Sequence, residues 1–342
     1  MQSHLPLNPR PLGARKRAAS GAKISLDCKE VSHGYVKSFD GTKLFYSSEG
    51  CGKPLVFCYG LVCSSLHWTY QIDHFSEAYR AVWFDYRGHH NSERPKDLKS
   101  LTLENIAKDL AVVLDELGIQ DAVLLGHSMG VNVVLEFYKR FPDRVAGMVL
   151  ANGAPKNPLE TLFNINAFQA LFPALKKLHQ KAPRLISMLW RSQKSNPLAK
   201  TLVTLGGFNP HLTPQADIEL YLKQVIETDL AILLQMAESY EASNTLAWLH
   251  QVKVPTLIIA GEHDKVIPLE QQELMQQLIP GSQLEIIRHG SHCPQMDLPD
   301  LINLKIEKFL DGFNYVKESS PSTETANRSN EKLEFDNQIR VV

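Results

Sequence analysis

A serine flanked by glycines stands at the junction of two apolar segments. The stretch AVLLGHSMGVNVVLEFY, residues 122–138, holds four apolar residues, then GHSMG at 126–130, then an apolar pattern with helical spacing. This is a G-x-S-x-G pattern between a buried strand and a helix, the setting of a nucleophile elbow. The backbone of such a turn is strained and crowded, so glycine is needed on both sides of the serine. The pattern predicts that Ser128 is a nucleophile; the alternative is an ordinary glycine-bounded turn.

A serine hydroxyl is a weak nucleophile, so a base and a group that orients the base must come from elsewhere in the chain. The elbow predicts that the acid follows the serine in the sequence and that the histidine follows the acid. Asp264 ends the segment PTLIIAGEHD just past a buried strand, where catalytic groups gather in open α/β sheets. Its alternative role is a helix N-cap or a solvated loop acid. Glu262 and Asn152, also at strand ends, are weaker candidates for the acid.

Two histidines follow the last apolar segment, in QLEIIRHGSHCPQ. His292 lies deeper in the loop, just before the final helix, so its side chain can reach over the strand ends. His289 lies nearer the strand, and we expect it to pack against its neighbours. The sequence therefore predicts a catalytic set of Ser128, Asp264 and His292.

The elements that must position these residues alternate along the chain. Three stretches have helical apolar spacing, at 102–119, 269–281 and 298–312. Short runs rich in Val, Ile, Leu and Phe read as buried strands: KLFYSS, PLVFCYG, YRAVWFDY, DAVLLGHS, VAGMVLANG, PTLIIAGEHD and QLEIIRHG. This alternation predicts an α/β protein with a doubly wound, mostly parallel sheet of about eight strands.

One segment breaks the alternation. Residues 155–250 are helical in character, contain no clear strand, and are divided by prolines into short helices. We predict that this segment is a helical cap inserted after strand 6 of a core formed by residues 30–154 and 251–314. Residues 1–29 and 315–342 are polar or proline-rich and are predicted to be a disordered N-terminal arm and C-terminal tail.

The composition excludes several classes of protein. The chain has 342 residues, 44% of them hydrophobic, and a formal net charge of −1, which does not favour nucleic acid as a partner. No apolar run approaches the ~20 residues that span a bilayer. The five cysteines form no metal-ligand or C-x-x-C pattern. We expect reduced thiols, no metal and no cofactor, in a cytoplasmic protein whose oligomeric state the sequence does not indicate.

Several of these motifs, in this order, resemble those of the α/β-hydrolase fold superfamily, in particular its capped serine esterase and lipase-like group. The resemblance covers about residues 30–312 and rests on GHSMG, GEHD and GSHCPQ. The family often also carries Asp-x-Arg-Gly-x-Gly-x-Ser after its fourth strand. Here that segment reads DYRGHHNS, residues 85–92, with His90 in place of the second glycine. The resemblance implies a structural role for it, beside the elbow.

The resemblance also implies an oxyanion hole. The family's loop after the third strand usually begins His-Gly, whereas here Tyr59 precedes Gly60 in CYGLV. By resemblance the two donors are the backbone N–H groups of Leu61 and Met129. Trp68 matches an aromatic residue with a packing role. Three residues flank the catalytic loops and are expected to contact substrate: Tyr59, Val62 and Val266.

The implied function is that of a serine hydrolase cleaving a carboxylic ester with an apolar acyl or alcohol group. Serine at position 128 argues against the dehalogenase and epoxide hydrolase branches, which use a carboxylate nucleophile. Cys293 after the histidine, where C–C hydrolases often have tryptophan, weakens but does not remove that alternative. Lactonase, thioesterase, amidase and perhydrolase activities would use the same triad. A ligand receptor of this fold with little turnover is the alternative from outside enzymology.

Overall fold

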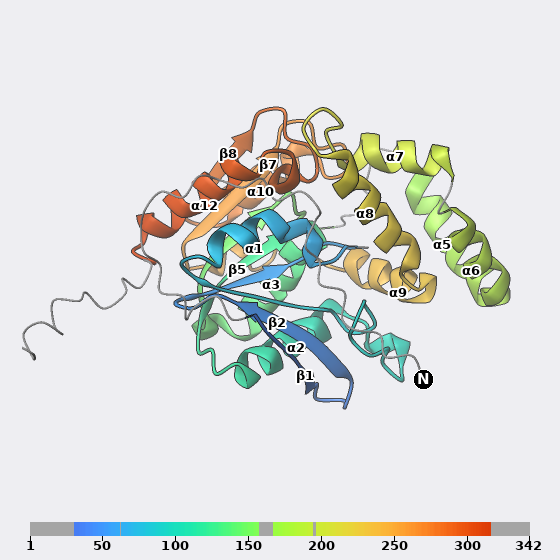
Figure 1. The fold of residues 1–342 in the computed structure, drawn as a ribbon, viewed down its shortest axis with the longest axis horizontal. Helices are drawn as coiled ribbons and strands as arrows, with labels where there is room; N and C mark the ends of the chain where they lie inside the picture. Colours follow the sequence, from blue (N-terminus) through green and yellow to red (C-terminus); the bar gives the residue numbers. More distant parts are fainter. Residues whose placement is uncertain (1–30, 62, 157–166, 194–195, 316–342) are drawn as a thin grey trace, which may run out of the picture.

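The computed structural model describes residues 31–61, 63–156, 167–193 and 196–315. The predicted N-terminal arm and nearly all of the predicted C-terminal tail lie outside these residues. The described part forms one sheet with helices on both faces and a group of helices projecting from one side (Figure 1).

The sheet has eight strands in the order β1-β2-β4-β3-β5-β6-β7-β8. The β1–β2 and β2–β4 pairs are antiparallel, and every other pair is parallel. This confirms the predicted fold class. The strands are β1 (Ser32–Lys37), β2 (Lys43–Glu49), β3 (Pro54–Cys58), β4 (Arg80–Phe84), β5 (Ala122–His127), β6 (Val145–Ala151), β7 (Thr256–Gly261) and β8 (Gln283–Ile287).

Central strands are buried on both faces, which is why they read as continuous apolar runs. The layers over them contain α1 (Thr69–Phe75), α2 (Leu103–Glu116), α3 (Met129–Arg140), α10 (Leu269–Leu278), α11 (Pro294–Asp297) and α12 (Pro299–Gly312). Short 3₁₀ helices occupy Ser65–Trp68, Leu98–Ser100, Pro142–Arg144 and Leu249–Gln251. Helix α2 begins where the sequence indicates, because the Thr102 hydroxyl accepts a hydrogen bond from the Asn105 N–H.

Between β6 and β7 the described chain is helical. We call this set of helices the helical insertion: α5 (Ala167–Lys181), α6 (Pro183–Ser192), α7 (Pro197–Gly207), α8 (Gln215–Glu227) and α9 (Leu230–Glu241). Pro183 and Pro197 occupy first helical turns, where a missing N–H costs nothing. The two connections to the sheet are joined, because the N–H and hydroxyl of Thr245 both donate to the Pro155 carbonyl at 2.8 Å.

Three details differ from the sequence predictions. β1 was not among the apolar runs, because its exposed edge alternates without a continuous apolar core. Tyr315, assigned to the tail, is buried, and its hydroxyl donates to the Pro54 carbonyl at 2.8 Å. Cys51 is disulfide-bonded, so the expectation of reduced thiols is wrong for this residue, whereas Cys58, Cys63 and Cys293 are free. Spacing along the chain does not reveal which cysteines approach in space.

No helix among the described residues is long and apolar enough to cross a membrane.

Candidate active site

Ser128 lies in a sharp turn between β5 and α3. Its backbone adopts φ 55° and ψ −124°, a strained conformation for a residue with a side chain. A Cβ atom at Gly126 would lie 2.6 Å from the Gly130 carbonyl oxygen, and one at Gly130 would lie 2.3 Å from the Cys58 carbonyl oxygen. Both glycines of the G-x-S-x-G pattern are therefore required by close backbone approach.

The structure brings Ser128, His292 and Asp264 together from positions far apart in the sequence. His292 Nε2 lies 3.1 Å from Ser128 Oγ, and His292 Nδ1 lies 2.9 Å from Asp264 Oδ2. The other carboxylate oxygen of Asp264 accepts the N–H groups of Val266 and Ile267 at 2.7 and 2.9 Å. Asp264 is thus fixed by its own loop while it orients the imidazole, and the imidazole can take the serine proton.

The backbone of the histidine loop is held from two neighbouring strand ends. The Asn152 side-chain amide donates to the carbonyls of Ser291 and His292, each at 2.9 Å, and accepts the Gly261 N–H at 2.8 Å. His127 Nε2 lies 2.7 Å from the same His292 carbonyl. Asn152, a weaker candidate for the catalytic acid, lies where it positions His292.

Asp297 holds the histidine loop from the other side. Its carboxylate accepts the Ser291 N–H at 2.6 Å and also the N–H of Asn209 at 3.1 Å, together with the Thr213 hydroxyl. Asn209 and Thr213 belong to the connection between α7 and α8. One buried carboxylate therefore joins the catalytic loop to the helical insertion.

His127 and His67 form a buried pair beneath the elbow. Because His127 Nε2 faces a carbonyl it must carry the proton, which leaves Nδ1 to accept from His67 Nδ1 at 3.4 Å. Burial lowers the pKa of His127 well below its usual value and the pKa of His67 to about 3, so both stay neutral. The sequence analysis did not single out His67, whose partner is 60 residues away.

Two groups of residues could hold a metal ion, judged over the part of the chain that is described. One is the buried pair with Cys293; the other is the exposed cluster of Glu262, His263 and His289. The second contains the rejected alternatives for the acid and the base: Glu262 accepts the His289 N–H at 3.0 Å, and neither contacts Ser128. The structure thus places Glu262 and His289 outside the catalytic arrangement.

The loop after β3 approaches the nucleophile closely. A Cβ at Gly60 would lie 2.9 Å from Ser128 Cβ, so glycine is required there. Met129 is the first residue of α3, and its N–H has no partner within the helix. The helix dipole adds positive potential at this end. Leu61, the other predicted donor, follows Gly60 in the same loop.

Of the three residues expected to contact substrate, the structure describes Tyr59 and Val266. Tyr59 is fully buried: its hydroxyl accepts the Tyr86 N–H, its carbonyl accepts the Tyr86 hydroxyl, and the two rings stack. The side chain is thus used within the core, and a contact between Tyr59 and substrate stays a prediction. Val266 is partly buried and adjoins Asp264 through its backbone. Val62 lies outside the described residues.

Tyr240, on α9 of the helical insertion, is a site residue that the sequence did not indicate. It is buried, and its hydroxyl has no hydrogen-bond partner among the described residues. Burial raises the pKa of Tyr240; the neighbouring Ser128 hydroxyl partly offsets this, and the charge of Asp264 adds to it. An un-ionised phenol therefore lies beside the nucleophile.

A cavity of about 440 Å³ opens on the Asp264 side of this arrangement. It lies between the helical insertion and the loops after β7 and β8, and it is open to solvent. Its lining includes Leu205, Phe208, Asn209, His211, Asp264 and Ser291. Apolar side chains of the insertion thus face a space next to the acid.

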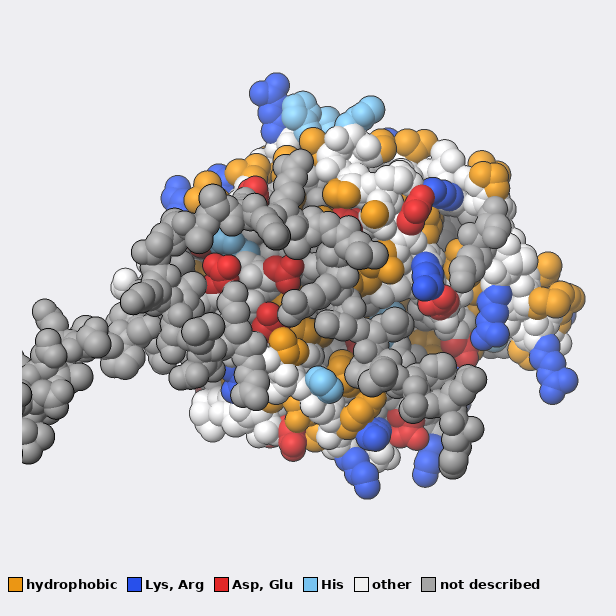
Figure 2. Space-filling model, in the orientation of Figure 1, with side chains coloured by type: hydrophobic (Ala, Val, Ile, Leu, Met, Phe, Trp, Pro, Cys, Tyr) orange, Lys and Arg blue, Asp and Glu red, His pale blue; other side chains and the backbone are white. Residues whose placement is uncertain are grey.

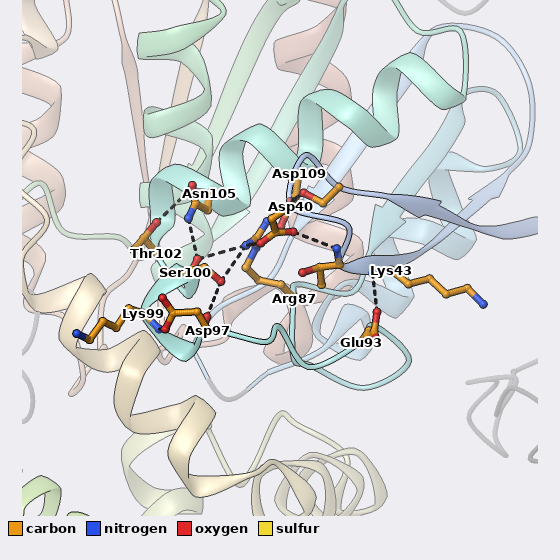
Figure 3. A network of polar contacts seen from close by, with 12 residues as sticks. Asp40, Lys43, Arg87, Glu93, Asp97, Lys99, Ser100, Thr102, Asn105 and Asp109 are labelled. Atoms are coloured by element: carbon orange, nitrogen blue, oxygen red, sulfur yellow. Dashed lines mark hydrogen bonds and ion pairs between the residues drawn. The ribbon is translucent and has the colours of Figure 1, made fainter.

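The DYRGHHNS segment contributes Arg87 to a network of hydrogen bonds and ion pairs (Figure 3). Arg87 is fully buried and forms a bidentate pair with Asp109 of α2, with Nε to Oδ2 at 2.6 Å, and a further bond to Asp40 at 2.9 Å. Burial raises the pKa of Asp109, and the bonds to Arg87 oppose that shift. His90, at the position where the family has glycine, adopts φ 45° and bonds the Cys63 carbonyl at 2.9 Å.

Comparison with known proteins agrees with this architecture. The family model described as "alpha/beta hydrolase fold" matches residues 53–299. The chain belongs to the α/β-hydrolase fold family.

Relatives within this family differ in their described activities. The chain is 26% identical over 318 residues to bifunctional epoxide hydrolase 2 of Mus musculus, covering 84% of this chain and 57% of the mouse protein's length. It is 27% identical to epoxide hydrolase 3 of Xenopus tropicalis, covering 89% and 84%. Among solved structures, an esterase from Exiguobacterium antarcticum has a TM-score of 0.67 at 21% identity, covering 81% and 98%. At this identity the likeness concerns the fold.

Proposed function

We propose that the protein is a serine hydrolase that cleaves a carboxylic ester through an acyl-enzyme on Ser128. The observation that carries the proposal is the position of His292, which bridges Ser128 Oγ at 3.1 Å and Asp264 at 2.9 Å. Ser128 Oγ attacks the ester carbonyl while its proton passes to His292 Nε2, and the N–H groups of Leu61 and Met129 bind the oxyanion. His292 then gives that proton to the departing alcohol oxygen. Water, deprotonated by His292, releases the acid and restores Ser128.

The proposal includes an apolar acyl or alcohol group and a cap. Support comes from Leu205 and Phe208, which line the cavity beside Asp264. Tyr240 of α9 borders Ser128, so we propose that the helical insertion covers the site and excludes water. The Tyr240 hydroxyl is placed to donate a hydrogen bond to a substrate oxygen at the reacting centre.

The chemistry of Ser128 argues against epoxide hydrolysis, despite the names of the relatives. Attack of a serine oxygen on an epoxide would form an alkyl ether. Such an ether has no carbonyl for water to attack, so the enzyme would stop after one event. A carboxylate nucleophile instead forms an ester, which water can cleave.

A fluorophosphonate probe tests the proposal directly. It should label Ser128, as located by mass spectrometry, and abolish hydrolysis of p-nitrophenyl butyrate; Ser128→Ala should lose both labelling and turnover. Labelling of another serine would overturn the assignment. Labelling of Ser128 without turnover of any acyl ester, thioester or lactone in a panel of varied chain length would favour the receptor alternative. Turnover of epoxides instead of esters would refute the ester mechanism.

A further inference from the structure

Charge is distributed very unevenly along the sequence. Residues 161–216 contain no Asp or Glu, although the chain has 37 acidic residues. The same segment has basic residues at Lys176, Lys177, Lys181, Arg184, Arg191, Lys194 and Lys200. A chain with net charge −1 therefore concentrates positive charge in one part of the helical insertion. Such an asymmetry is a sign of a local electrostatic partner.

The described helices of this segment also expose large apolar side chains on their outer surface. On α6, Leu185, Met188 and Leu189 are 52%, 60% and 48% exposed, and their spacing places them on one stripe. Leu178 of α5 is 50% exposed. Lys177, Lys181, Arg184 and Arg191 are exposed among them. We call these eight residues the cationic–apolar surface.

This surface is not needed to attach the helices to the protein. The opposite face of α6 already packs inward, with Ile186 buried in a cluster with Leu230 and Leu234 of α9. A helix that has one buried apolar face gains nothing from a second in water, and exposed apolar patches rimmed by charge mark interaction sites. Helices α5 and α6 project furthest from the sheet, and hydrophobic and basic side chains gather at that end of the molecule (Figures 1 and 2).

We propose that the cationic–apolar surface docks onto an anionic lipid bilayer. An amphipathic helix with Leu and Met at its centre and Lys and Arg at its rim lies in the interface plane, burying the apolar groups among acyl chains. The basic rim is complementary to acidic headgroups. A nucleic acid would also match the charge, but it offers no apolar layer to cover Leu185, Met188 and Leu189. The surface lies away from the triad, and this inference does not depend on the proposed reaction.

Vesicle flotation with the full chain tests the docking. Ser128→Ala serves as the background, so that lipid turnover cannot alter the vesicles. We expect binding to phosphatidylglycerol vesicles that weakens with added salt, and much weaker binding to phosphatidylcholine vesicles. Combined replacement L185S/M188S/L189S should reduce partitioning about tenfold or more, as should R184E/R191E. L304S is the matched control, because Leu304 is 59% exposed on α12 and should leave binding unchanged.

Three outcomes would overturn the proposal. The first is no binding to anionic vesicles by the Ser128→Ala protein with its cationic–apolar surface intact, when circular dichroism shows that this protein is folded. The second is binding that L304S reduces as much as the α6 variant does. The third is a different occupant: a concentration-dependent dimer, or a nucleic acid complex, that the L185S/M188S/L189S variant abolishes while vesicle binding persists.

Discussion

Three histidines lie in the nucleophile elbow and in the histidine loop, and the position of each one decides what it does. His292 alone reaches both Ser128 and Asp264. His127 faces the opposite way and bonds the His292 carbonyl. His289 lies on the surface near Glu262, with its backbone at φ 64°. The position of His292 within its loop indicated its role from the sequence, whereas the role of His127, the residue before the serine, is visible only in the three-dimensional structure.

The histidine assignment gives a paired prediction. His292→Ala should lower kcat for the ester roughly 10³-fold or more, because members of a catalytic unit fail together. His289→Ala should keep most activity, because its side chain is exposed and outside the triad. Steady-state kinetics on p-nitrophenyl butyrate distinguish the two, and the reverse ranking would contradict the assignment.

Tyr240 gives a second prediction at this scale. Tyr240→Phe removes only the hydroxyl that lies beside Ser128, so packing of α9 should persist. If that hydroxyl donates to the reacting oxygen, kcat/KM should fall roughly tenfold to 10²-fold, somewhat less than loss of a main oxyanion donor. An unchanged melting temperature identifies the loss as chemical. Full activity in a folded variant would show that the phenol only fills space.

The buried histidine pair predicts a stability change with pH. The pKa of His67 falls from 6.5 unfolded to about 3 folded, so the unfolded chain binds the proton first, and stability is lost as pH drops below about 6.5. Between pH 7 and pH 5 the free energy of unfolding of the native protein should fall by about 2 kcal/mol, because His67 takes up a proton in the unfolded chain and not in the folded one. His67→Gln has no side chain that titrates in this range. The difference in free energy of unfolding between the native chain and this variant, measured by urea titration, should therefore be about 2 kcal/mol smaller at pH 5 than at pH 7. A constant difference would argue against a neutral buried His67.

At the scale of elements, strands with apolar runs were predictable and the contacts between loops were not. The central strands are buried on both faces, so composition alone marks them. β1 lies at the antiparallel edge and alternates exposed residues, so it lacks that signal. Asn152, Asp297 and Tyr240 act through partners more than 80 residues away or in another layer, and no local pattern encodes such distances. The elbow was predictable because its strain falls within five consecutive residues.

The buried ion pair between Arg87 and Asp109 of α2 leads to a prediction at the scale of structural elements. Arg87→Leu would leave the Asp109 carboxylate buried and unpaired, and should lower the free energy of unfolding by about 3 kcal/mol or more. Arg94→Leu is the matched control, because the Arg94–Asp229 pair is exposed and should contribute about 1 kcal/mol or less. Urea denaturation measures both. Equal decreases in the free energy of unfolding would mean that the buried Arg87–Asp109 pair stabilises the protein no more than a surface ion pair does.

At the scale of the whole molecule, the two ends of the helical insertion make different kinds of contact. Among the described residues of the α5–α6 end, Ile186 packs against Leu230 and Leu234, which belong to α9 of the insertion itself. The α7–α8 end is bonded through Asp297 to the loop that carries His292. A sequence can show that an insertion exists and where it starts. It cannot show how the insertion is attached, because the attaching bonds, such as those of Asp297 to Asn209 and Thr213, join residues far apart in the sequence.

That shared carboxylate makes Asp297 a common contact of the helical insertion and the histidine loop. Swinging the α7–α8 connection outward would break the bonds to Asn209 and Thr213, and would leave the Ser291 N–H held by a carboxylate free to turn. The bonds of Asn152 and His127 to the carbonyls of Ser291 and His292 would remain, so the histidine loop would lose its support on one side only. Asp297 thus makes the backbone that precedes the catalytic imidazole depend in part on the position of the helical insertion.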